Sequence, residues 1–141
     1  MQKMLQLLGD RRAMLQEEGK SQRGFTLVEL LVVVIIIGIL AGIAIPVFLN
    51  QRTAAWRAEV ETDLKNAALA AETYAVNNEG SYTGLDLTEL GNNGYRASGD
   101  TTMAVTATAG DFLLTATNTN LPTGQQSLTY DSDGGGLANW P

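Results

Sequence analysis

Residues 30–49 form an apolar run that contains no charged or hydrogen-bonding side chain. A helix of that length spans roughly 30 Å, which is about the thickness of the hydrocarbon core of a bilayer. The pattern therefore predicts a membrane-spanning helix near the start of the chain.

A helical period continues after the apolar run ends. Apolar residues recur at intervals of three and four and form one stripe, made of Trp56, Val60, Leu64, Ala67, Ala68, Ala71 and Ala75. We expect the charged residues of this segment to lie mostly on the opposite face. They are Glu59, Glu61, Asp63, Lys65 and Glu72. With a stop signal at residues 77–80 (NNEG), the pattern predicts one helix over residues 25–80, whose stripe packs in the core.

The period changes at residue 81. Turn-forming residues surround a short apolar patch in residues 81–99, which predicts a packed connecting loop. Alternation of Met103, Val105 and Ala107 with threonines predicts a strand over residues 102–108.

Two further strands are expected after a tight turn at residues 109–110. The first covers residues 111–117, and the second covers residues 126–131 with Leu128 and Tyr130 on one face. The tail from residue 134 is expected to be irregular, with Trp140 folded back. The predicted fold class is α+β: a long helix, hydrophobic in its first half and amphipathic in its second, packs through its alanine face on a small antiparallel sheet of three to four strands.

The charge is distributed unevenly along the chain. The first 24 residues carry five basic and three acidic side chains, whereas the rest carry four basic and twelve acidic ones. Positive charge before an apolar segment favours a cytoplasmic N-terminus, so we expect the acidic remainder outside. Four basic side chains on an acidic surface predict no strong nucleic-acid interface. A weak amphipathic helix ending near Gly19 is also predicted in the first 24 residues.

A cleaved secretory signal is an alternative interpretation of the N-terminal region. Its cleavage site would lie at the small residues 41–44. The apolar run is about twice as long as the apolar region of such a signal, which favours the membrane helix.

The chain contains no cysteine and no histidine. It therefore has no disulfide, no thiolate, and neither the usual proton shuttle at neutral pH nor the commonest transition-metal ligand. Because no Ser/His/Asp set and no phosphate-binding loop appears either, we expect that the protein is not an enzyme.

Glu29 is the one acidic residue at the start of the apolar segment. A buried carboxylate is tolerated when it is paired with a cation. Cleavage after Gly24 would give Phe25 a free amine, and pairing of Glu29 with the amine of a staggered neighbouring helix would fix the register of the two helices. The alternative is a carboxylate that reaches the membrane interface alone.

Two glycines and a proline interrupt the apolar run. Gly38 and Gly42 are spaced as a GxxxG pair, which permits close approach of another helix. Pro46 removes a backbone donor and clashes with the carbonyl of Gly42, so a kink is predicted there. The alternative is that glycine and proline are simply common in membrane helices.

Asp131 and Asp133, followed by Gly134, are the only metal candidates. Alternating acids before a glycine can bind Ca²⁺, but the further oxygen ligands of a complete calcium loop are missing. A simple turn is the commoner role of such a cluster, so we expect no cofactor, with Ca²⁺ as the alternative.

The stretch GFTLVE at residues 24–29, followed by the aliphatic run, resembles the class III signal of type IV pilins and pseudopilins. Residues 78–82 (NEGSY) also resemble the junction between helix and loop in these proteins. The resemblance implies cleavage by a prepilin peptidase after Gly24, N-methylation of Phe25, and assembly into a helical filament in which the acid matching Glu29 pairs with a neighbouring N-terminus. It also implies that the segment around Gly38, Gly42 and Pro46 unwinds on assembly.

The resulting domain prediction has four parts. They are a leader peptide (1–24), a transmembrane and filament-core helix (25–49), an amphipathic helix (50–80), and a head made of the connecting loop and sheet (81–141). Two features depart from the family: the chain cannot form a disulfide-closed C-terminal loop, and its leader is longer and more acidic than that of the best-known subgroup.

The resemblance implies a structural subunit of a type IV pilus used in adhesion, twitching motility or DNA uptake. The expected partners are other copies of the chain, the prepilin peptidase and methyltransferase, the assembly platform, minor pilins, and the lipid bilayer before assembly. The expected location is the cytoplasmic membrane for the single-pass precursor and the outside of the cell for the pilus. Two alternatives remain: a pseudopilin of a type II secretion or competence system, and a membrane-anchored protein that never polymerises.

Overall fold

The computed structural model describes residues 24–141. The predicted leader peptide, except for Gly24, and the predicted amphipathic helix ending near Gly19 lie outside the described residues. The chain divides into two compact units between Ala44 and Ile45, and each unit is described by itself.

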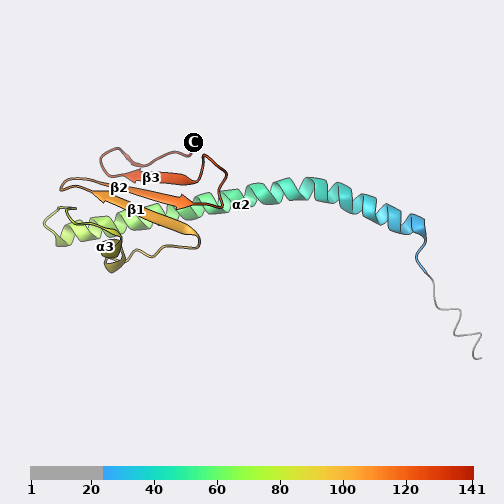
Figure 1. Ribbon diagram of the computed structural model, residues 1–141, viewed down its shortest axis with the longest axis horizontal. Coiled ribbons are helices and arrows are strands. Elements are labelled where there is room, and N and C mark those ends of the chain that lie inside the picture. The colour runs from blue at the N-terminus through green and yellow to red at the C-terminus, as the bar shows by residue number, and fades with distance from the viewer. Residues whose placement is uncertain (1–23) are drawn as a thin grey trace, which may run out of the picture. The chain divides into compact units, whose positions relative to one another are not determined.

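The dominant element is helix α2, Leu27–Asn77, with 51 residues (Figure 1). The sequence predicted this helix over residues 25–80, which is two residues too early at the N-terminal end and three residues too late at the C-terminal end. Its C-terminal end is closed by the amides of Asn78 and Gly80, which both donate to the carbonyl of Ala75, at 3.0 and 2.8 Å. Glu79 and Gly80 have positive φ angles of 58° and 84°, as expected where a helix terminates in the left-handed region.

The predicted antiparallel sheet is confirmed, and it has four strands in the order β1-β2-β3-β4. The strands are β1 (Thr101–Ala107), β2 (Phe112–Asn118), β3 (Ser127–Asp131) and β4 (Gly136–Leu137). The predicted turn between β1 and β2 is also present, since the amide of Thr108 donates to the carbonyl of Asp111 at 2.9 Å.

The tail was predicted to be irregular, and this is wrong at one point. Gly136 and Leu137 form β4 and pair with Asp131 and Tyr130 of β3. Trp140 does fold back as predicted: its indole Nε1 donates to a carboxylate oxygen of Glu61 at 2.8 Å.

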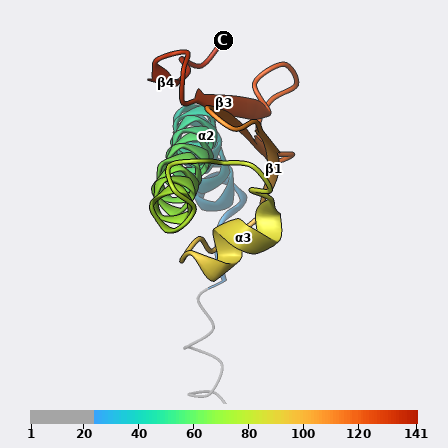
Figure 2. The same cartoon turned by 90° about the vertical axis from the view of Figure 1, so that its left-hand side faces the viewer.

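The segment 81–99 was predicted to be a loop throughout, but it contains helix α3, Leu87–Asn92. The side chain of Asp86 accepts from the amide of Glu89 at 2.8 Å and caps this helix. Leu90, on its inner face, is fully buried. Viewed along α2, the sheet covers one side of the helix and α3 lies beside the edge at β1 (Figure 2).

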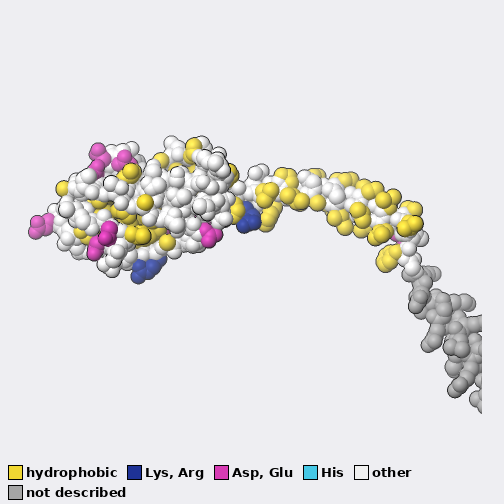
Figure 3. Space-filling model, in the orientation of Figure 1, with side chains coloured by type: hydrophobic (Ala, Val, Ile, Leu, Met, Phe, Trp, Pro, Cys, Tyr) yellow, Lys and Arg dark blue, Asp and Glu magenta, His cyan; other side chains and the backbone are white. Residues whose placement is uncertain are grey.

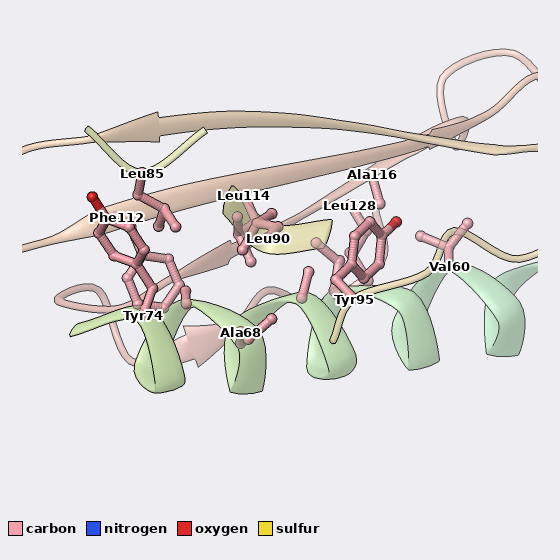
Figure 4. Close-up of a cluster of buried hydrophobic side chains, with 14 of the residues drawn as sticks. Val60, Ala68, Tyr74, Leu85, Leu90, Tyr95, Phe112, Leu114, Ala116 and Leu128 are labelled. Carbon is pink, nitrogen blue, oxygen red and sulfur yellow. The ribbon is translucent and has the colours of Figure 1, made fainter. Parts of the chain in front are cut away.

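The core lies between the C-terminal half of α2 and the sheet (Figure 4). From α2 it receives the predicted stripe, in which Ala67, Ala68 and Ala71 are buried. Small side chains on the helix leave room for larger ones on the sheet, and β2 supplies Phe112 and Leu114. The aromatic ring of Phe112 packs edge-on against Tyr82 and parallel to Tyr130, with centroid distances of 4.8 and 5.9 Å.

Asp63 was expected among the charged residues on the outer face of the helix, and this is wrong. Its side chain is 1% exposed. The carboxylate accepts from the backbone amide of Ser98 at 3.1 Å and from the Ser98 hydroxyl at 2.5 Å. Asp63 therefore fastens the segment before β1 to the middle of α2 and is satisfied inside the core.

Tyr95 gives the head a predictable response to alkaline pH. Its side chain is 4% exposed, and its hydroxyl has no hydrogen-bond partner among residues 24–141. Burial, aided by the charge of Asp63, raises the pKa of Tyr95 to about 12. In the unfolded chain, the phenol titrates at about 10.

The stabilising contribution of the neutral phenol is thus complete below about pH 10 and is lost as the pH rises toward 12. We expect Tyr95→Phe to leave the free energy of unfolding nearly unchanged at neutral pH and to reduce its loss in alkaline solution. Urea titrations of the full chain in detergent at neutral and alkaline pH will measure this, and an equal alkaline loss in both proteins would contradict the assignment to Tyr95.

Candidate functional site

The candidate site is the N-terminal end of α2, where Gly24, Phe25 and Glu29 were predicted to act. Thr26 precedes the first helical residue and its hydroxyl accepts from the amide of Glu29 at 3.2 Å. In return, the Glu29 oxygen Oε2 accepts from the backbone amide of Thr26 at 2.9 Å and from its hydroxyl at 3.0 Å. These reciprocal bonds form a capping box, which satisfies amides that would otherwise be orphaned at the start of the helix.

Sequence reasoning missed Thr26 as a functional residue. The signal was available, since a threonine followed three residues later by a glutamate at the start of an apolar run is the pattern of a capping box. Glu29 consequently has a local role in helix initiation, in addition to whatever it does with a second molecule.

The capping box leaves half of the carboxylate available. All bonds that Glu29 accepts end on Oε2, and Oε1 has no hydrogen-bond partner within the part of the chain that the structure describes. A carboxylate has about four lone-pair positions, so a second donor can approach without displacing Thr26.

A groove of about 650 Å³ lies beside Glu29. Apart from the glutamate, its lining is apolar and consists of Phe25, Val28, Leu30, Val32 and Val33. Phe25 is 92% exposed, so its position offers no packing within the chain. The groove therefore presents one negative group inside an apolar surface, which favours a partner with an apolar body and a single positive charge.

The apolar segment that follows is exposed along its whole length. No large hydrophobic side chain from Leu30 to Leu49 is less than 48% exposed. Figure 3 shows this as a continuous hydrophobic surface on the N-terminal part of α2. By length and composition, α2 is the one helix among the described residues that can cross a membrane. Monomeric soluble proteins rarely expose apolar patches beyond a few hundred Å², so this surface needs lipid or other copies of the helix around it.

Gly38, Gly42 and Pro46 all lie inside α2, which is helical at each of these positions. A Cβ atom added to either glycine would meet no atom within 4 Å. Glycine destabilises a helix interior by about 1 kcal/mol relative to alanine, and within the single chain neither position makes a close contact that would require glycine. The predicted kink and unwinding stay predictions.

Asp131 and Asp133 lie at the turn between β3 and β4. The carboxylate of Asp131 accepts from the amides of Asp133 and Gly134, at 3.1 and 2.9 Å. A Cβ at Gly134 would come within 2.5 Å of this carboxylate, so a larger residue there would push the Asp131 side chain out of its present position. Among residues 24–141, no group of three or more acidic side chains is placed to hold a metal ion. The turn explains both Asp131 and Gly134, and calcium binding stays a prediction.

Comparisons with known proteins bear on the same N-terminal segment. Residues 19–45 match the family described as the prokaryotic N-terminal methylation motif. The type IV major pilin protein PilA of Myxococcus xanthus is 48% identical over 52 residues, which cover 37% of this chain and 24% of PilA. The type IV major fimbrial protein FimA of Dichelobacter nodosus is 35% identical over 92 residues, which cover 63% of this chain and 59% of FimA.

A secretion protein matches as well. The type II secretion system core protein G of Klebsiella michiganensis is 39% identical over 59 residues, which cover 42% of each protein. No solved structure matches the chain significantly.

The matches cover at most about three fifths of these three relatives. They contain the methylation motif and the apolar helix, and the fold adds the long helix packed on an antiparallel sheet. These features fit a precursor anchored in a membrane by its N-terminal helix. In its motif, its relatives and its fold together, the chain is similar to type IV pilins and pseudopilins.

Proposed function

We propose that this protein is a structural subunit of a type IV pilus. The leader is removed after Gly24, Phe25 is N-methylated, and the processed chain polymerises through its apolar helix into a surface filament. The observation that carries the proposal is Glu29, a half-satisfied carboxylate beside an apolar groove at the start of an exposed apolar helix segment.

Electrostatics explains why a second copy is the partner of Glu29. Inside a bundle of apolar helices, an unpaired carboxylate is costly, and the same holds for the new amine of Phe25. Within one chain, Thr26 occupies the near side of the carboxylate. The amine of a neighbouring copy, shifted along the helix axis, can reach the remaining oxygen and bring its apolar side chain into the groove.

The same interaction sets the order of events. Before cleavage, the chain continues past Phe25 into the leader, so the amine that Glu29 needs does not exist. Processing by a prepilin peptidase and methyltransferase therefore precedes polymerisation, which an assembly platform and minor pilins would support. The precursor resides in the cytoplasmic membrane with its N-terminus in the cytoplasm, and the filament is extracellular.

The glycines of the apolar segment support assembly as well. Since the single chain has no use for the missing Cβ atoms of Gly38 and Gly42, their role lies in contact with other helices or in a weakened helix. Pro46 removes one more helical hydrogen bond nearby. We propose that this stretch unwinds when the subunit moves from lipid into the filament.

The outward face of α2 in the head adds a further surface for neighbouring copies. Leu69 and Val76 lie seven residues apart on this face and are 68% and 81% exposed. Thr62 and Thr73 share it, and their hydroxyls donate to the carbonyls of Ala58 and Leu69, at 2.7 and 2.8 Å. Because these two hydroxyls are satisfied within the helix, a neighbouring subunit that covers them would leave neither of them unpaired.

A pilus is favoured over a secretion pseudopilus by the relatives. The match to the fimbrial protein FimA extends over 92 residues, whereas the match to core protein G extends over 59. The role is structural rather than catalytic, since the chain contains no histidine or cysteine and its groove at Glu29 holds a single ionisable side chain.

Mass spectrometry of filaments sheared from the cell surface tests the proposal. We expect an N-terminal peptide that begins at methylated Phe25 to be a main species of the filament fraction. Presence of the processed peptide in membranes together with its absence from filaments would contradict a pilus subunit and favour a pseudopilin or an anchored monomer.

A further inference from the structure

The base of the head carries two matched pairs of an arginine and a tryptophan. The guanidinium carbon of Arg52 lies 4.6 Å from the centroid of a Trp56 ring, and that of Arg57 lies 5.4 Å from the centroid of a Trp140 ring. These are the only two tryptophans of the protein, and the two arginines are half of the four basic side chains after Gly24. We call these four residues the collar.

The collar lies just beyond the apolar run, which ends at Leu49. At 1.5 Å per residue, the Cα atoms of Arg52 and Arg57 are about 4 and 12 Å further along the helix axis. The polar headgroup layer on each side of a bilayer is about 5–8 Å thick. Because the Cα–Cβ bonds of a helix tilt toward its N-terminus, both long side chains lean back toward the membrane end of the head. The Arg52–Trp56 pair is thus placed at the depth of the headgroups, and the Arg57–Trp140 pair lies just beyond them, where the Arg57 side chain can reach back toward the phosphates.

Each arginine of the collar makes its direct contacts with a neutral partner. The Nη2 group of Arg57 donates to the side-chain oxygen of Gln125, and its buried Nε has no hydrogen-bond partner among the described residues. The partner of Arg52 is an aromatic face. Trp56 and Trp140 are both half-buried, and amphipathic rings of this kind are enriched at membrane interfaces.

A groove of about 620 Å³ opens beside the second pair. Its lining includes Asn50, Arg57, Gln125 and Trp140, together with one carboxylate, that of Glu61. Glu61 lies one helical turn further from the membrane than Arg57, and it accepts from the indole of Trp140. An anion that arrives from the membrane therefore meets the guanidinium before the carboxylate.

We propose that the collar binds the phosphates of anionic phospholipids and holds the head against the outer leaflet until the subunit is assembled. The remaining surface of the head is mainly acidic and would be repelled by an anionic membrane, so the collar is the part of the head that can face such a membrane. Guanidinium groups match phosphate oxygens in charge and in geometry. This inference rests on the membrane-anchored stage of the proposed function.

The two tryptophans make the test direct, because all intrinsic indole fluorescence comes from the collar. The full chain is reconstituted into vesicles that contain phosphatidylglycerol or phosphatidylcholine, each with a quencher near its headgroup. We expect quenching to show preferential association of phosphatidylglycerol. Replacing Arg52 or Arg57 by glutamine should lower this preference about fivefold for each arginine, as expected for one basic side chain at an anionic surface.

Lys65→Gln is the matched control, since it makes the same charge change on the same helix, about 12 Å beyond Arg57, at an exposed position. It should leave the lipid preference unchanged, and Arg52→Lys should retain part of it. Circular dichroism of each variant checks that the head is folded. Soluble glycerol phosphate should not compete, because it lacks the membrane that places the phosphate at the collar.

Equal quenching by the two lipids in a correctly inserted chain would overturn the inference. So would a loss of lipid preference in Lys65→Gln as large as the loss in the arginine variants. Neither result would contradict the proposed pilus function. Competition by soluble glycerol phosphate, or binding of polyglutamate in place of lipid, would overturn it in favour of another anion. Release of the chain from vesicles by an alkaline wash would instead overturn the membrane-anchored stage itself.

Discussion

Glu29→Val should abolish filaments while leaving the chain in the membrane. Removal of one partner from a buried ion pair costs about 3–5 kcal/mol, which corresponds to a loss of at least about 100-fold in the equilibrium for adding each subunit. The substitution also makes the apolar segment more hydrophobic, so insertion into lipid should not suffer. Protein in sheared surface filaments and protein in the membrane fraction, measured by immunoblot, separate the two effects.

Thr26→Val is the matched control, because it removes the hydroxyl of the capping box and keeps the carboxylate. Loss of a helix cap costs about 1 kcal/mol, and the amide of Thr26 can still donate to Glu29. We expect Thr26→Val to reduce filaments modestly. If both substitutions eliminate filaments equally, the role of Glu29 is helix initiation and the pairing between subunits is wrong. If Glu29→Val leaves filaments intact, a membrane-anchored protein that does not depend on this carboxylate is the better description.

Phe112→Ala should unfold the head or bring it close to unfolding. The ring is 2% exposed and contacts the rings of Tyr82 and Tyr130. It lies at one end of the core (Figure 4). Truncation of a buried phenylalanine costs about 3–5 kcal/mol, a large part of the 5–15 kcal/mol that stabilises a typical domain. Urea unfolding of the full chain in detergent, followed by near-ultraviolet circular dichroism, measures the loss.

Leu113→Ala provides the comparison at the next position of β2. Leu113 points to the other face of the sheet and is 40% exposed. Its truncation should cost less than about 1 kcal/mol, since surface substitutions seldom exceed that range. Similar costs for the two substitutions would mean that the sheet does not bury the face we describe.

The long helix and the three main strands were predictable because each has a strong local period. In α2, the stripe from Val60 to Ala75 repeats every three to four residues, and it is buried as expected. In β1, alternation of Met103 and Val105 with threonines identified the strand and its inner face. The predicted ends of α2 differ from the observed ends by only two and three residues. Both ends have local capping signals, at Thr26 and at Gly80.

The missed features depend on contacts between distant parts of the chain. The helical pattern alone predicts Asp63 as a surface charge, and only its contact with Ser98, 35 residues later, shows that it is buried. Strand β4 has two residues and exists because Tyr130 and Asp131 offer a free edge. Helix α3 is different, since the sequence from Asp86 to Glu89 already has a capping pattern, and the turn-forming residues around it obscured that signal.

The sequence singled out Glu29 as the candidate site residue, but it did not show the contact with Thr26 or the geometry of the carboxylate. An acid at the start of an apolar run identified Glu29, and nothing in the pattern showed which of its oxygens was already occupied. The carboxylate of Asp131, predicted only as a weak metal candidate, accepts bonds within its own turn, which the sequence did not show.

The capping box has a consequence for the dissolution of a filament. In the filament that we propose, a subunit that leaves its neighbours would lose the cation on Glu29, yet both bonds from Thr26 would remain because they are made within the same chain. The returning monomer thus re-enters lipid with its helix start intact and its carboxylate partly solvated by its own backbone. Recycling a subunit therefore requires no refolding at this end, and the same molecule can be used for another round of growth.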